Sequence, residues 1–147
     1  MWFVTSGSSK HPSAVGAMTT TGAVTAFIGG RHAGLTNDPI GYFGIAAGPD
    51  GNLWFSEPAN ATIARITPSG AVTETAAGGA LPFKVTPGPR SSMWYTINGA
   101  SAIGEITTAA RPSVTVYAIP SPLPGATSNP QSIVAGTDGN LYFTDCG

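Results

Sequence analysis

The sequence predicts an all-β fold built from repeated antiparallel sheets, and three observations support this prediction. The chain has 147 residues, of which 20 are Gly and 13 are Pro, and these two residue types break long helices and favour frequent turns. Short runs of β-branched and aromatic residues lie between the turns. One stretch of sequence recurs three times, which is the signature of a repeat architecture.

The recurring stretch occupies residues 43–57, 83–97 and 131–145. In each copy a glycine is followed, six residues later, by a pair of aromatic residues. The aligned residues are Gly48 with Trp54-Phe55, Gly88 with Trp94-Tyr95, and Gly136 with Tyr142-Phe143. Trp2-Phe3 matches the same aromatic pair, so the chain opens inside the same unit. The first aromatics of the pairs are 52, 40 and 48 residues apart, within the range expected of propeller blades.

Each unit reads as four short strands separated by turns. Asp50-Gly51 and Asp138-Gly139 predict two-residue hairpin turns, because Asp and Gly tolerate a positive φ. Ser69-Gly70 is a weaker version of the same signal. The run 53–56 is typical of a strand, whereas the Pro-rich run 119–124 predicts a connection between units, since Pro cannot donate to a β-ladder. We expect up to about 12 strands and no helix.

Four strands per repeat of this length predict a β-propeller of four-stranded antiparallel blades. The sequence units lie at approximately 1–52, 53–92 and 93–140, with the start of a further unit at 141–147, in one domain over residues 1–147. A propeller ring normally closes with about 4–8 blades, so we expect about three blades of a probable six or seven. The chain would be a fragment of a larger propeller or, alternatively, a half-ring that closes by homo-oligomerising. Either form exposes apolar faces and strand edges, which predicts self-association.

Composition limits the classes of function. Hydrophobic residues make up 41% of the chain and predict a buried core, whereas charged residues make up only 9%. The six Lys and Arg residues are scattered, and the net charge is −1, which disfavours nucleic-acid binding. No apolar run is long enough to span a membrane. Low charge with abundant Thr, Ser, Gly and Ala slightly favours an extracytoplasmic (secreted or periplasmic) location, which the sequence otherwise leaves open.

The second unit resembles a blade of the virginiamycin B lyase (streptogramin lyase) family, which is similar to NHL-type propellers. The residues that carry the resemblance are Gly-Pro-Asp-Gly-Asn-Leu-Trp-Phe-Ser-Glu at 48–57 and Ile-Ala-Arg-Ile-Thr-Pro-Ser-Gly-Ala-Val-Thr-Glu at 63–74. The resemblance implies a seven-bladed ring. It also implies an elimination that opens the ester-linked ring of type B streptogramins, with a Mg²⁺ ion that polarises the ester and a catalytic His that removes the α-proton.

The catalytic positions of that family are not matched here. In the family the His stands in a Pro-His-(Gly/Ala)-Ile context, and the matching positions are Phe43, Phe83 and Gln131. The family's acidic partner two residues earlier corresponds to Gly41, Leu81 and Asn129. The resemblance therefore assigns no catalytic residue and no metal ligand to this segment, and Mg²⁺ is implied for the family only. Whether the whole protein is an enzyme stays open.

We expect a ligand-facing rim formed by the residues that precede each glycine turn and by two carboxylates. These are Phe43, Phe83, Gln131, Glu57 and Asp145. Glu57 and Asp145 occupy the same position in their units, and they are either acceptors at the mouth of the ring or partners of a neighbouring strand or turn. The ligand would be a small molecule, a protein or a glycan. A non-catalytic propeller that binds such a ligand is therefore the alternative to a lyase.

The remaining candidates have structural interpretations. His11 and His32 are expected in solvated loops, and Cys146 cannot form an internal disulfide because it is the only cysteine. Arg65 and Glu105 align with each other, and their opposite charges suggest a variable, exposed position. The aromatics that recur at one position are expected to pack between blades; they are Trp2, Trp54, Trp94 and Tyr142.

Overall fold

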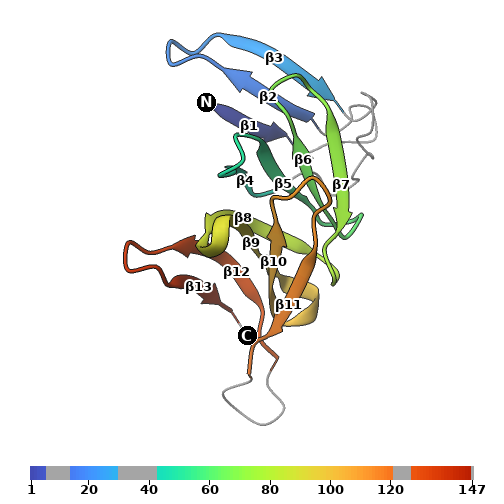
Figure 1. Ribbon diagram of the computed structural model, residues 1–147, viewed down its shortest axis with the longest axis vertical. Coiled ribbons are helices and arrows are strands. Elements are labelled where there is room, and N and C mark those ends of the chain that lie inside the picture. Colours follow the sequence, from blue (N-terminus) through green and yellow to red (C-terminus); the bar gives the residue numbers. More distant parts are fainter. Residues whose placement is uncertain (6–13, 30–42, 121–126, 147) are drawn as a thin grey trace.

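The computed structural model describes residues 1–5, 14–29, 43–120 and 127–146 (Figure 1). This part of the chain forms thirteen strands and two short 3₁₀ turns, η1 (Pro89–Ser91) and η2 (Asn98–Ala100). The strands are β1 (Trp2–Thr5), β2 (Ala14–Met18), β3 (Val24–Gly29), β4 (Ile45–Ala47), β5 (Leu53–Glu57), β6 (Thr62–Ile66), β7 (Val72–Ala76), β8 (Pro82–Gly88), β9 (Ser92–Ile97), β10 (Ala102–Thr107), β11 (Val114–Ala118), β12 (Pro130–Ala135) and β13 (Leu141–Asp145).

The strands form four antiparallel sheets in chain order. Two sheets have four strands, β4–β7 and β8–β11, while β1–β3 form a three-stranded sheet and β12–β13 a two-stranded one. The expected all-β fold of four-stranded antiparallel sheets is confirmed. The first strands β4, β8 and β12 contact one another in succession, so the sheets are joined along their first strands (Figure 1). Three of the sheets begin one strand before the aromatic strand at which the sequence units were divided, whereas the first sheet begins with its aromatic strand β1. No helix in the described ranges could span a membrane.

Four hairpin loops share one geometry. They are Thr19–Ala23, Gly48–Asn52, Thr67–Ala71 and Gly136–Asn140, and in each the first N–H donates to the last carbonyl while the fourth N–H donates to the first carbonyl. The fourth residue is always Gly, with φ between 74° and 91°. These are three-residue loops of the type I turn plus bulge class, so the prediction of two-residue hairpins at Asp50-Gly51 and Asp138-Gly139 is wrong. The reason is that only the Gly has a positive φ, whereas a two-residue type I′ turn needs one at both central residues. The Asp50 carboxylate accepts from the Asn52 N–H at 3.2 Å and holds the loop around the Gly.

The β8–β9 loop departs from this geometry. Arg90 and Ser91 stand where the other loops have Asp-Gly or Ser-Gly, and both have a positive φ, 61° and 53°. The Ser92 N–H donates to the Pro89 carbonyl, which closes the turn. Two consecutive left-handed residues are the signature of a type I′ turn. Gly88 still pairs with Ser92, so this loop has three residues like the others, but its two left-handed positions are filled by neither Asn nor Gly.

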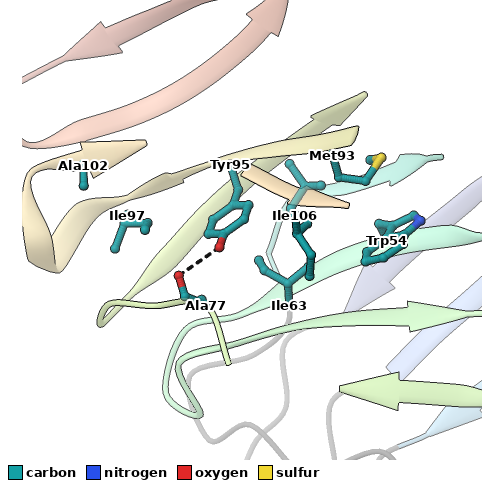
Figure 2. Close-up of a cluster of buried hydrophobic side chains, with 9 residues drawn as sticks. Trp54, Ile63, Ala77, Met93, Tyr95, Ile97, Ala102 and Ile106 are labelled. Atoms are coloured by element: carbon teal, nitrogen blue, oxygen red, sulfur yellow. Dashed lines mark hydrogen bonds between the residues drawn. The ribbon is translucent and has the colours of Figure 1, made fainter. Parts of the chain in front are cut away.

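The main core lies between the two four-stranded sheets (Figure 2). Its fully buried side chains include Trp54 from β5, Ile63 from β6 and Tyr95 from β9. The Tyr95 hydroxyl donates to the Ala77 carbonyl at 2.8 Å, and burial raises the pKa of Tyr95. A Cβ atom on Gly104 would lie 2.2 Å from the Tyr95 ring, so only glycine lets the ring lie across β10. The core thus combines two aromatic rings, of which Tyr95 lies over a glycine of the next strand, with mainly aliphatic side chains.

The expectation that the recurrent aromatics pack between blades holds for some of them. Trp54 and Trp94 are buried, and Trp2 is half-buried. Tyr142 is 56% exposed, so the expectation is wrong for this residue. The reason is that Trp54 and Trp94 pack against side chains of the following sheet, Met93 and Ile133 respectively, whereas no described sheet follows β13.

Candidate ligand-facing rim

The start of each first strand and the end of each second strand lie at one edge of their sheet. Pro82 pairs with Ile97 and Pro130 pairs with Asp145, because β8–β9 and β12–β13 are antiparallel. The Phe43 N–H donates to the Ser56 carbonyl at 3.1 Å, which places Phe43 beside the end of β5. Phe43, Phe83 and Gln131 therefore lie along the same edge as Glu57 and Asp145, and we call this edge the rim. Their role in facing a ligand remains a prediction.

Phe43 and Phe83 stack on each other across two sheets. Their ring centroids are 4.7 Å apart and the ring planes differ by 26°. Both side chains are half-buried, so each ring keeps part of its surface open. The stack forms because β4 and β8 approach closely: a Cβ on Gly44 would lie 2.7 Å from the Val85 backbone nitrogen. The two phenyl rings thus make a continuous apolar surface at the rim.

Hydroxyl groups fasten the rim residues to the preceding sheet. The Ser56 hydroxyl donates to the Phe83 carbonyl at 2.5 Å, and the Thr96 hydroxyl donates to the Gln131 carbonyl at 3.4 Å. Ser56 and Thr96 both follow the aromatic pair of their unit, so the same contact recurs in successive sheets. The sequence analysis missed these residues. The signal that could have revealed them is the repeated hydroxyl at 56, 96 and 144.

The two rim carboxylates are held by local partners. Glu57 is fully buried, and the hydroxyl of Thr62, its cross-strand neighbour, donates to Oε2 at 2.5 Å. Asp145 is exposed, and it accepts from the Ser128 hydroxyl and from the Asn129 N–H, the latter at 2.6 Å. These contacts favour the interpretation of both residues as strand and turn partners.

A polar cleft of about 430 Å³ opens on the rim beside Asp145. Its walls come from the β9–β10 turn, the start of β12 and the residue after β13. The lining residues are Asn98, Gly99, Ser101, Thr127, Ser128, Asn129 and Cys146. The Ser101 hydroxyl donates to the Ser128 carbonyl at 2.5 Å and ties the two walls together. Cys146 is an exposed free thiol.

The described residues do not bring together a donor set for a metal ion. In the ranges that the structure describes, no three His, Cys, Asp or Glu side chains converge as a metal site requires. His11 and His32 lie outside the described residues. The described residues therefore do not fit the Mg²⁺ ion that the family resemblance implies.

The expectation of a variable, exposed position at Arg65 and Glu105 is wrong. The side chains are 13% and 9% exposed, and each lies in an ion pair at the edge opposite the rim. Arg65 lies 3.9 Å from Asp50 and over the Trp54 ring at 5.4 Å. Arg90 donates to both carboxylate oxygens of Glu105, at 3.1 and 2.6 Å. The alignment of opposite charges thus reflects two ion pairs of reversed sign, in which Arg65 and Glu105 are the shielded partners.

These pairs shift the acidity of their carboxyl groups. Hydrogen bonds from Arg90 hold the pKa of Glu105 below its ordinary value of 4.5. Partial burial raises the pKa of Asp50, but hydrogen bonds from Trp54 and Asn52 outweigh it and leave the pKa below 3.8. Both carboxylates are therefore charged at neutral pH and serve the fold.

Comparison with known proteins identifies the family to which this chain belongs. All 147 residues match the model of the virginiamycin B lyase family, and no curated protein matches the chain. The chain is 29% identical to virginiamycin B lyase from Staphylococcus aureus, with a TM-score of 0.75, over 97% of this chain and 47% of that one. A streptogramin B lyase structure is 26% identical, with a TM-score of 0.72, over 90% and 41%.

A catalytically inactive variant of the Staphylococcus aureus enzyme, solved with quinupristin, is 26% identical, with a TM-score of 0.71, over 97% of this chain and 47% of that one. The chain therefore spans less than half the length of these three structures. Its sheets correspond to blades of their propellers. The match over residues 1–147, together with this likeness in fold, shows that the chain belongs to the virginiamycin B lyase family.

Proposed function

We propose that this chain forms a ligand-binding wall of a lyase-type propeller, and that its ligand is a cyclic depsipeptide of the streptogramin B class. The observation that carries the proposal is the Phe43–Phe83 stack, with centroids 4.7 Å apart at the rim. Two half-open phenyl rings offer a flat apolar surface to an aromatic or aliphatic side chain of such a ligand. The likeness to a relative solved with quinupristin supports this choice of ligand class.

The wall has the rigidity that a binding surface needs. Ser56 fixes the backbone of Phe83, and the close approach of Gly44 to Val85 fixes the separation of the two rings. Side chains whose positions are set by packing and hydrogen bonds lose little conformational freedom when a ligand binds. The polar cleft beside Asp145 supplies amide and hydroxyl groups farther along the same rim.

The chemical step of the family would be carried by residues beyond those of this rim. Elimination needs a base at the α-proton and a group that polarises the ester carbonyl. Phe43, Phe83 and Gln131 stand at the three positions that match the family's His, and none of their side chains can accept a proton at neutral pH. The role that we assign to this segment is therefore to bind and orient the ring, and opening of the ester in the whole protein is part of the proposal.

A second candidate is a non-catalytic propeller that binds its ligand at the same rim. It is favoured by the same three side chains, since a protein that never performs the elimination has no need of a base there. The flanking coding sequence separates the two candidates. Further blades that carry Pro-His-(Gly/Ala)-Ile units would support the lyase, and blades that lack them would support the binding protein.

The test uses quinupristin with the 147-residue chain in the presence of Mg²⁺. Binding is measured by calorimetry, and the ligand is then recovered and analysed by chromatography with mass spectrometry. Elimination within a ring gives a linear product of unchanged mass and altered retention, whereas hydrolysis adds the mass of one water. We expect binding and an intact ring. Absence of binding would overturn the proposed ligand class, and ring opening would overturn the assignment of a binding role alone.

A further inference from the structure

The last sheet leaves its aromatic strand uncovered. Phe143 is 41% exposed and Val134 is 58% exposed, whereas Phe55 and Tyr95 are fully buried at the position of Phe143. In the complete blades a third strand covers the aromatic pair, with Ala64 opposite Phe55 and Gly104 opposite Tyr95. β13 has no such neighbour among the described strands.

The first sheet has the complementary deficiency. It contains β1, β2 and β3, which correspond to the second, third and fourth strands of a blade, and Phe3 already lies opposite Gly16 of β2. The described residues supply no first strand on the open edge of β1. The first sheet therefore has the covering strands that β13 lacks, and the last sheet has the first strand that β1 lacks.

β1 and β13 are the same strand type, so β1 can take the place of β13 against β12. In the last sheet Ile133 pairs with Phe143, and Val134 pairs with Tyr142. The same register in the second blade pairs Ile45 with Phe55. If β1 paired with β12 in that register, Phe3 would stand opposite Ile133 and Trp2 opposite Val134.

We propose that two copies of this chain associate by strand exchange, with β1 of each copy displacing β13 from β12 of the other. Each junction then becomes a four-stranded blade made of β12 from one copy and β1, β2 and β3 from the other. Twelve strands of each copy stand in blades, so two copies form six blades, within the range of about 4–8 at which propellers close. The exchange continues the blade-to-blade interface that the chain already forms between its two complete sheets.

A glycine beside β12 fits the incoming tryptophan. A Cβ on Gly48 would lie 2.5 Å from the Trp54 ring nitrogen, and one on Gly88 would lie 2.6 Å from the Trp94 ring. Gly136 makes the equivalent contact with Tyr142, at 2.7 Å. Exchange would seat Trp2 against Gly136, as the other two tryptophans are seated in their own blades.

β13 competes with the incoming strand through a few local hydrogen bonds. The Ser132 N–H donates to the Thr144 hydroxyl at 3.1 Å, and Asp145 accepts from Ser128 and Asn129. The Tyr142 hydroxyl donates to Asp138 at 2.7 Å. Because β13 must leave before β1 can pair with β12, weakening β13 should strengthen the dimer.

Sedimentation of the 147-residue chain tests this competition, because the two explanations predict opposite effects of Tyr142→Ser on the affinity of the dimer. We expect a concentration-dependent dimer, which Tyr142→Ser tightens by about tenfold and Trp2→Ser loosens by about tenfold. Val116→Thr is the control, because Val116 is also an exposed apolar residue, at 41% against 56% for Tyr142, but lies on the outer strand β11. Nonspecific association through the exposed face of β13 would be weakened by Tyr142→Ser. That result, or a monomer at every concentration, would overturn the proposal. The partner of β12 would then be β13 or a strand of a longer polypeptide.

Cross-linking tests the register. In a Cys146→Ser background, Val4→Cys combined with Ser132→Cys places two thiols opposite each other across the proposed junction. Thr5→Cys with Ser132→Cys is the control, because a shift of one residue turns the side chain to the other face. Two complete blades separate the two sites within one copy, so a disulfide between them must be intermolecular. We expect covalent dimers from the first pair only, and equal yields from both pairs would refute the proposed register.

Discussion

Arg90 and Glu105 form a two-point ion pair whose charges are the reverse of the pair formed by Asp50 and Arg65 one blade earlier. Asp50 and Arg90 stand in the same hairpin loop of their blades, and Arg65 and Glu105 stand opposite Trp54 and Trp94 in the same cross-strand register. In both blades the guanidinium lies over the tryptophan ring, at 5.4 and 5.1 Å. In both complete blades opposite charges thus flank the tryptophan, and the order of the two charges is reversed between them.

This relationship predicts that the charges of the third blade can be exchanged. Arg90→Asp or Glu105→Arg alone places like charges against each other and lowers the melting temperature. The double variant recreates the arrangement of Asp50 and Arg65 and should recover most of that loss. Thermal unfolding of the four proteins measures the coupling. Losses that simply add in the double variant would show that the two side chains do not interact in solution.

The same pair predicts a pH dependence of stability. Because the pKa of Glu105 is lowered in the folded protein, its contribution to stability is present above its ordinary pKa of 4.5 and is lost as the pH falls through the lower folded value. Glu105→Gln should therefore be less stable than the parent at pH 7, and the gap should narrow below about pH 4.5. Urea unfolding at pH 7 and pH 3 measures it. A gap that is equal at both values would mean that the carboxylate charge contributes nothing.

The β8–β9 loop predicts a stabilising substitution. Ser91 has a φ of 53° and follows Arg90 at 61°, and left-handed backbone costs an L-residue about 1–2 kcal/mol. Ser91→Gly removes that cost. Glycine also raises the conformational entropy of the unfolded chain, but this opposing effect is smaller, so we expect the free energy of unfolding to rise by about 0.5–1 kcal/mol. Gly51→Ala in the second blade is the converse control, with an expected loss of about 1 kcal/mol. Urea unfolding decides it, and a destabilised Ser91→Gly would contradict the described turn.

The hydroxyl contact between blades predicts a specific loss of stability. Ser56→Ala removes the donor to the Phe83 carbonyl, and an unsatisfied buried acceptor costs about 1–3 kcal/mol. Ser69→Ala serves as a control, since Ser69 is exposed in a loop and bonds only to Thr67 in its own turn. Its expected effect is within about 0.5 kcal/mol. Equal losses from the two variants, measured by urea unfolding, would argue against the inter-blade bond.

The parts of the fold that depend on the period of the sequence repeat could be predicted from the sequence. The spacing of Gly48, Gly88 and Gly136 before each aromatic pair was enough to place the strands, since these glycines accommodate the rings that follow. The rim could also be located, because aligned positions of a repeat occupy equivalent places in successive sheets. The alignment alone places Phe43 and Phe83 at equivalent positions of successive sheets, where their rings stack.

The parts that depend on pairing between blades could not be predicted. In a single sequence, the alignment of Arg65 with Glu105 suggests a position that accepts any side chain. The ion-pair partner of each residue lies in a hairpin loop, and the sequence of that loop differs between the blades. Tyr142 is exposed because no described sheet follows its own, and its position in the repeat unit does not reveal this. The left-handed backbone at Arg90 and Ser91 has no local sequence signal, since neither residue is a Gly or an Asn.

The measurement that tests the central claim most directly is the affinity of the chain for quinupristin with and without the rim stack. Phe83→Ala removes one ring of the pair, whereas Val116→Thr changes an apolar residue on an outer strand away from the rim. Calorimetric titration should show binding by the parent chain and by Val116→Thr, and about a tenfold weaker affinity for Phe83→Ala, which corresponds to about 1.4 kcal/mol. Equal affinities for Phe83→Ala and the parent would contradict the assignment of this rim as the ligand-binding wall.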